Sequence, residues 1–241
     1  MKGTVRKDIA VFLAECSILT YEQFHQNGLF TIPEGFQVVL SFKALSIYEE
    51  EWFGFILESD QCAVISFRGT QSDPDWIADA NIGQTVYPYA DAGKVHKGFL
   101  SIYESCRETV MEALKAVPSH KQLLITGHSL GAALATLCAL DVYENTDFPS
   151  PLMYTFGGPR VGDQSFVNVF QQTAIQYLRF VNLSDLVPLL PPSRIKNPYT
   201  NTVFTYRHLP RLFLFSIQKG SIKNNHSMYT YLEAIEELPE E

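Results

Sequence analysis

The segment Lys121–Gly131 constrains the fold of this chain more than any other. Its sequence is Lys-Gln-Leu-Leu-Ile-Thr-Gly-His-Ser-Leu-Gly, and Ala132-Ala133-Leu134-Ala135 follow. The apolar run suits a strand and the alanine-rich continuation suits a helix, so Gly127-x-Ser129-x-Gly131 predicts a sharp turn between them. Glycines are needed there because strand and helix pack too closely for larger side chains. Ser129 then lies at the positive end of the helix, where negative charge from acyl transfer is stabilised.

Apolar patterns predict alternating strands and helices along the chain. Strands are expected at 37–42, 52–57, 62–67, 121–126, 152–156, 176–182 and 203–207, with a hairpin among the first three. Helices are expected at 6–21, 99–117, 129–143, 163–173 and near 227–237. This alternation predicts an α/β fold with a central, mostly parallel sheet and helices on both faces. Functional sites in such sheets form beyond the carboxyl ends of the strands.

Length and composition limit the protein class. The 241 residues suit one domain, and the net charge of −8 argues against nucleic acid partners and against electrostatic docking on anionic membranes. No apolar run reaches the roughly 18 residues of a transmembrane segment. The N-terminus lacks the apolar region and cleavage site of a signal peptide. We therefore expect a cytoplasmic protein, unless the chain is a mature secreted form; the oligomeric state stays open.

The cysteines give no sign of disulfides or metal binding. Cys16, Cys62, Cys106 and Cys138 each lie in an apolar context, and none belongs to a Cys-x-x-Cys pair. Buried thiols are the expected state. The sequence has no cluster with metal-ligand spacing, so we expect no metal or organic cofactor.

A serine hydroxyl needs a base, and that base needs a third group to orient it. After a Gly-x-Ser-x-Gly turn, the acid and then the histidine follow the serine along the chain, which leaves His208 and His226. His226 opens the last helix from a polar loop, which suits a base. His208 follows a strand-like run and fits a histidine satisfied by backbone groups. His128, beside the serine, is expected to point into the structure.

Asp141, Asp147, Asp163 and Asp185 are the candidate acids. Asp141 belongs to the helix after the serine and is expected to point away, Asp147 lies in a turn, and Asp163 fits a helix N-cap. Asp185 follows the strand 176–182, so it lies at a carboxyl end, with prolines stiffening the loop behind it. We favour Asp185; the alternative is an ordinary turn aspartate.

Several segments together resemble one family. They are Phe67-Arg68-Gly69-Thr70, Trp76-Ile77-Ala78-Asp79, His96-Lys97-Gly98-Phe99, Gly127–Gly131, Thr155–Gly162, Asp185–Pro188 and His226-Ser227-Met228. In this order, over about residues 60–235, they are similar to the class 3 lipases, the fungal-type triacylglycerol lipases and their bacterial and plant relatives. The resemblance implies a single α/β-hydrolase domain over 1–241 and a triad of Ser129, Asp185 and His226.

An oxyanion hole needs two donors aimed at the tetrahedral oxygen. The backbone N–H of Leu130, the residue after the nucleophile, is expected to be one. By resemblance, Thr70 supplies the second through its N–H and hydroxyl, and Asp79 holds that hydroxyl. The alternatives are an ordinary turn threonine and a solvated helix residue.

Residues 72–83 are expected to form a short amphipathic helix at the family's lid position. Trp76, Ile77 and Ala80 share its apolar face. A lid excludes water until substrate or an interface arrives. Because this apolar face is small, we expect weak interfacial activation at most. The alternative is a fixed surface helix with Trp76 in the core.

The expected function is hydrolysis of carboxylic esters, acylglycerols above others, through an acyl-enzyme. The expected partner is a lipid or ester substrate at a lipid–water interface. A phospholipase A1 or short-chain esterase on the same site is the alternative, and a non-catalytic lipid-binding relative is the alternative from another class. For the apolar segment 209–217 near the base, buried core is the default expectation, and an acyl groove is the alternative.

Overall fold

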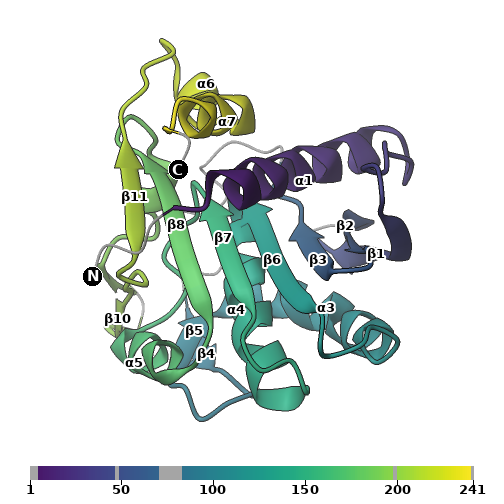
Figure 1. Ribbon diagram of the computed structural model, residues 1–241. Coiled ribbons are helices and arrows are strands. Elements are labelled where there is room, and N and C mark those ends of the chain that lie inside the picture. The colour runs from purple at the N-terminus through teal and green to yellow at the C-terminus, as the bar shows by residue number, and fades with distance from the viewer. Residues whose placement is uncertain (1–4, 47–48, 71–82, 198–199, 240–241) are drawn as a thin grey trace.

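Residues 5–46, 49–70, 83–197 and 200–239 are described by the computed structural model, and Figure 1 shows how their elements are arranged. One large sheet forms the centre of the structure. Its strands, in spatial order, are β1 (Gln37–Leu45), β2 (Glu50–Glu58), β3 (Cys62–Phe67), β6 (Gln122–His128), β7 (Leu152–Phe156), β8 (Gln176–Asn182) and β11 (Leu212–Phe215). The pairs β1–β2 and β2–β3 are antiparallel, whereas the pairs β3–β6, β6–β7, β7–β8 and β8–β11 are parallel. The predicted α/β fold with a mostly parallel sheet and a hairpin is confirmed.

Helices cover both faces of the sheet, as predicted (Figure 1). The helical elements are α1 (Lys7–His25), α3 (Lys97–Leu114), α4 (Leu130–Asn145), α5 (Gln164–Gln172), the 3₁₀ turn η1 (Val187–Leu189), α6 (Ile222–Asn225) and α7 (Met228–Glu236). α1 and α7 pack on one face with one apolar cluster, and α3, α4 and α5 belong to the other cluster. The helices predicted at 6–21, 99–117, 129–143, 163–173 and 227–237 are confirmed, with ends shifted by a few residues, whereas the helix predicted at 72–83 falls outside the described residues.

Alternate side chains of β6 pack into different apolar clusters, one on each face of the sheet. Leu123 and Ile125 pack with the cluster that contains α3 and α4, whereas Leu124 packs with α1 and α7. Successive side chains of a strand point to opposite faces, so a strand covered on both sides is apolar throughout. The central strands therefore form a rigid platform whose carboxyl ends carry Ser129 and the loop to Asp185.

One prediction for the C-terminal third is corrected, and one is confirmed in part. The expected strand 203–207 does not join the main sheet, because β10 (Val203–Thr205) pairs with β9 (Arg194–Lys196) in a separate ribbon. The apolar segment 209–217 instead contains β11, which adds to the edge of the sheet beside β8. Phe213 and Phe215 pack against the core, so part of this segment is core rather than acyl groove. A further short pair, β4 (Gln84–Val86) and β5 (Lys94–His96), had no prediction.

The state of the cysteines agrees with the prediction of free, buried thiols for three of the four. All four cysteines are thiols; Cys16, Cys106 and Cys138 are buried, and Cys62 is half-buried. Among the helices that the structure describes, none is both long and apolar enough to cross a membrane.

His96 begins α3 and is fully buried. Its Nδ1 accepts a hydrogen bond of 3.3 Å from the backbone N–H of Phe99, and its ring stacks on that of Phe99 with centroids 4.0 Å apart. Burial lowers the pKa of His96 to about 4, because the charged ring would lose its hydration. The folded protein thus holds a neutral histidine that the unfolded chain would protonate near pH 6.5.

Acidification should weaken the fold through this group. Between pH 6.5 and about 4 only the unfolded state binds the proton, so the free energy of unfolding falls as pH falls, by up to about 1.4 kcal/mol per unit. His96→Asn keeps a capping acceptor but does not titrate, so urea unfolding from pH 7 to 4.5 should show a smaller slope. His120→Asn, at an exposed position, is the matched control. A His96→Asn slope equal to wild type would contradict this role.

Candidate active site

Ser129 lies on a strained turn between β6 and α4. Its φ of 58° and ψ of −124° place a non-glycine residue in a region that L side chains rarely adopt. A Cβ on Gly127 would lie 2.3 Å from the carbonyl oxygen of Gly131, and a Cβ on Gly131 would lie 2.1 Å from that of Phe67. Only glycine fits at either position, which confirms the predicted close packing around the serine.

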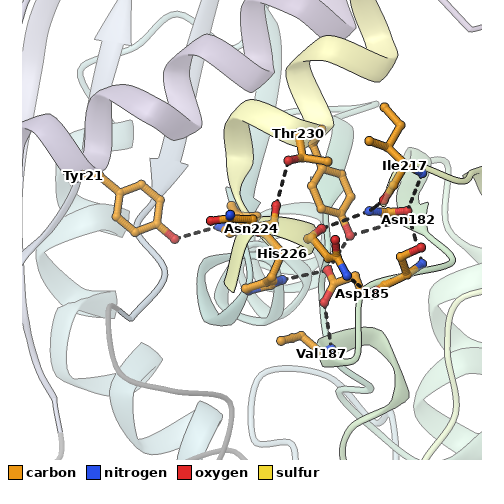
Figure 2. Close-up of polar contacts among 12 residues, drawn as sticks. Tyr21, Asn182, Asp185, Val187, Ile217, Asn224, His226 and Thr230 are labelled. Atoms are coloured by element: carbon orange, nitrogen blue, oxygen red, sulfur yellow. Dashed lines mark hydrogen bonds and ion pairs between the residues drawn. The ribbon is translucent and has the colours of Figure 1, made fainter. Parts of the chain in front are cut away.

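Asp185 follows β8 and is buried. Its Oδ1 accepts a hydrogen bond of 2.9 Å from the backbone N–H of Val187. Its Oδ2 accepts one of 2.7 Å from Nδ1 of His226 and one of 2.6 Å from the hydroxyl of Tyr231 (Figure 2). The favoured acid and the favoured base are thus in direct contact. Sequence reasoning missed Tyr231, which looks like any aromatic residue of an amphipathic helix.

His226 lies between α6 and α7, and its ring orientation follows from its partner. A carboxylate only accepts, so Nδ1 carries the proton that points to Asp185. In the neutral ring, Nε2 therefore holds a lone pair. This Nε2 is buried and has no hydrogen-bond partner among the described residues. The arrangement leaves one basic nitrogen available to a hydroxyl proton.

Asn182 ties the loop of the acid to the loop of the base. This fully buried side chain donates to the carbonyl oxygens of Ile217 (2.8 Å) and Asn225 (3.0 Å). Its oxygen accepts from the backbone N–H groups of Ser184 (3.2 Å) and Ile217 (3.0 Å). All the hydrogen-bonding capacity of the amide is used, which fixes one loop against the other (Figure 2). Its sequence signal is weak, because Asn at a strand end is equally typical of a turn.

His128 points into the structure, as predicted, and contacts the base. Its ring lies 4.4 Å from that of His226, at an interplanar angle of 32°. Nδ1 is 2.7 Å from the hydroxyl of Tyr21, and Nε2 is 2.7 Å from the backbone carbonyl oxygen of His226. Burial, and next the neighbouring His226, lower the pKa of His128 well below its ordinary value, so this ring is neutral.

The segment Arg68–Thr70 leaves β3 beside the serine. Arg68 is buried, forms an ion pair of 2.8 Å with Glu51, and lies between two aromatic rings, 4.0 Å from that of Phe24. Gly69 lies against the serine, since a Cβ there would be 3.0 Å from Cβ of Ser129. Thr70 is half-buried and comes next. Leu130 is the first residue of α4, and the first N–H groups of a helix lack intrahelical partners.

The alternative base has a structural role. Nε2 of His208 donates to the backbone carbonyl of Pro188 at 2.7 Å. Burial, and next the charge of Arg179, lower the pKa of His208 to about 3. A backbone-satisfied histidine was the expectation for this position, and it is confirmed.

Two alternative acids are likewise engaged elsewhere. Asp163 caps α5 by accepting a hydrogen bond of 2.9 Å from Phe166, as predicted. Asp141 is buried against α3, where it pairs with Arg107 at 2.6 Å and accepts from Tyr103 at 2.7 Å. Asp147 is exposed.

Part of the expected site falls outside the described residues. Trp76, Ile77 and Asp79, expected in the lid and its support, belong to this part of the chain. Within the described ranges, no group of three or more His, Cys, Asp or Glu side chains is arranged to hold a metal ion.

Comparisons with known proteins find similar sequences and a similar fold. The family model described as lipase (class 3) matches residues 64–195. A lipase of Rhizomucor miehei is 44% identical over 143 residues, covering 56% of this chain and 39% of the relative. Secreted mono- and diacylglycerol lipase 1 of Fusarium solani is 40% identical over 151 residues, covering 60% and 41%. A solved propeptide complex of a deletion mutant of Rhizomucor miehei lipase has a TM-score of 0.71 and 29% identity, over 89% of this chain and 69% of that one.

The extent of these matches matters for what they support. The chain spans about 40% of the length of the two sequence relatives, 39% and 41%. The expected cytoplasmic location finds no support in them, since one is named as secreted. The family model covers more than half of the chain, and the fold agrees with the solved structure. The chain therefore belongs to the class 3 lipase family.

Proposed function

We propose that this protein hydrolyses carboxylic esters, acylglycerols above others, through an acyl-enzyme on Ser129. The observation that carries the proposal is the hydrogen-bonded pair of Asp185 and His226, whose second ring nitrogen has no partner among the described residues. The ring of His128, the neighbour of Ser129, packs against the ring of His226, which supports a serine turn close to the base.

The reaction needs only side chains and backbone groups named above. Nε2 of His226 takes the hydroxyl proton as Oγ of Ser129 attacks the ester carbonyl. The N–H of Leu130 and the N–H and hydroxyl of Thr70 hold the resulting oxyanion. His226 then gives its proton to the leaving alcohol, and the acyl group stays on Ser129. A water attacks the acyl-enzyme with His226 again as base, while Asp185 stabilises the imidazolium in both halves.

The surroundings of the site favour an apolar substrate. Exposed apolar side chains lie within a few residues of the acid and the base, in the loop after β8, in η1 and in α6 and α7: Leu183, Leu186, Leu189, Ile222 and Tyr229. Apolar patches of this kind mark contact with lipid or protein. With a net charge of −8, contact with a lipid–water interface would rest on these side chains rather than on charge. The lid role of Trp76, Ile77 and Asp79 stays a proposal that rests on the family resemblance.

We further propose that residues 1–241 form one domain. The main sheet runs without interruption from β1, near the N-terminus, to β11, near the C-terminus. Helices from both ends of the chain, α1 and α7, cover one face of this sheet, and α3, α4 and α5 cover the other, which supports a single folding unit.

Two assays test the function. Hydrolysis of esters from C2 to C18, in monomeric and emulsified form and beside a diacyl phospholipid, separates lipase, esterase and phospholipase A1. Labelling with a fluorophosphonate tests for an activated serine. A folded protein that neither labels nor hydrolyses any of these esters would be a non-catalytic relative.

Ser129→Ala should abolish both readouts. An acyl-enzyme requires the hydroxyl, so kcat should fall on the order of 10⁶-fold while the protein folds normally. Ser101→Ala, at an exposed position of α3, is the control and should keep wild-type activity. Labelling that persists in Ser129→Ala would place the nucleophile elsewhere.

Asp185→Asn should lower kcat by roughly 10⁴, because an amide favours the wrong tautomer of the histidine. Asp163→Asn is the matched control, since asparagine caps a helix as well as aspartate does. Steady-state kinetics on a soluble ester measure both. Activity lost in the Asp163 variant and kept in the Asp185 variant would refute the assignment of the acid.

Thr70→Val should lower kcat by up to about 10²–10³ with little change in KM for soluble esters, because it removes one donor aimed at the oxyanion. The substitution keeps the shape of the side chain. A wild-type kcat would mean that the hydroxyl is structural and that backbone donors suffice.

A further inference from the structure

Tyr21, from the last turns of α1, reaches the site from the opposite end of the chain. Its hydroxyl lies 2.7 Å from Nδ1 of His128 (Figure 2). The same oxygen packs against Gly69, because a Cβ atom there would overlap it. Burial raises the pKa of this hydroxyl, so it is protonated at every pH at which the enzyme would work. One oxygen thus contacts both the segment that leads to Thr70 and the residue before Ser129.

The directions of these hydrogen bonds follow from their partners. The carbonyl oxygen of His226 can only accept, so Nε2 of His128 carries the ring proton. Because burial keeps that ring neutral, its Nδ1 must accept, and the Tyr21 hydroxyl must donate to it. The donated hydrogen bonds therefore run from Tyr21 to His128 and from His128 to the backbone carbonyl of His226, while the Tyr21 hydroxyl packs against Gly69.

The packing around the tyrosine oxygen leaves little freedom. A Cβ at position 69 would lie 2.2 Å from the Tyr21 hydroxyl and 2.7 Å from the carbonyl oxygen of His128. Only glycine allows the three groups to meet. The hydroxyl consequently fixes the distance between the oxyanion segment and the turn that carries Ser129.

We infer that Tyr21 is a positioning residue that couples the oxyanion segment to the base. This inference rests on the proposed function. Asp185 orients the ring of His226 through its side chain, but the backbone of His226 is held from the other side by His128. Tyr21 keeps His128 in the tautomer that can make this contact. Displacement of a catalytic group by about 1 Å costs as much as 10²-fold in rate.

Tyr21→Phe tests the inference, because it removes the hydroxyl and keeps the ring. On a soluble short-chain ester, kcat should fall about 10- to 100-fold, while KM stays within about twofold, since the loss affects positioning rather than binding. Tyr87→Phe is the matched control. The Tyr87 hydroxyl is also buried and donates to the carbonyl of Leu137 at 2.8 Å, in the other apolar cluster. This control should lose stability and keep kcat.

A second pair of variants, at His128, tests the next hydrogen bond in the same chain. In His128→Gln the amide N–H can still donate to the carbonyl of His226, so part of the activity should remain. His128→Leu has no donor and should lose at least as much as Tyr21→Phe. Circular dichroism and melting curves confirm that each variant is folded at the assay temperature.

The outcomes separate the two proposals. A wild-type protein that neither hydrolyses esters nor labels at Ser129 would overturn the proposed function. An active wild type with a Tyr21→Phe kcat equal to that of Tyr87→Phe would overturn the inference alone. Equal activity of His128→Gln and His128→Leu would do so as well.

Discussion

The contact between the backbone of α4 and the ends of β3 and β6 is the constraint on which the rest depends. Cβ atoms at Gly127 and Gly131 would overlap backbone atoms, so helix and strands approach as closely as peptide groups allow. This approach forces Ser129 into its positive φ and aims the start of α4 at the serine. It also explains why residues 130–142 are buried on every side, as expected of a helix without a polar face.

Around this contact the site stores unfavourable energy that other residues offset. The backbone of Ser129 costs on the order of 1–3 kcal/mol, and a buried nitrogen without a partner costs a similar amount. Neighbouring polar groups are, in contrast, fully satisfied: Asn182 uses its whole amide, and both oxygens of Asp185 accept. The strained backbone and the unpaired nitrogen thus belong to Ser129 and His226, the two residues that would react. Sites of this kind exchange stability for activity.

Local patterns in the sequence predicted the central elements, because apolar periodicity reports how a segment packs. The serine turn could be predicted from a local motif. Asp185 and His226 could be predicted because the fold class fixes the order of serine, acid and histidine along the chain. Pairing between distant segments has no local signal. The run 203–207 therefore looked like a sheet strand, whereas β11 took that place. Tyr21 was missed because it meets His128 across 107 positions of sequence.

The helices α1 and α7 lie side by side over one face of the sheet, and Lys7 donates to the carbonyl of Leu238 at 2.6 Å (Figure 1). Segments from both ends of the chain therefore close the site. Contacts between such distant segments carry the largest loop-closure cost and form late in folding. An intermediate with β3, β6 and β7 in place would present the serine turn without its base or its tyrosine. Ester hydrolysis would then report on completion of folding itself, since no partly assembled chain could display it.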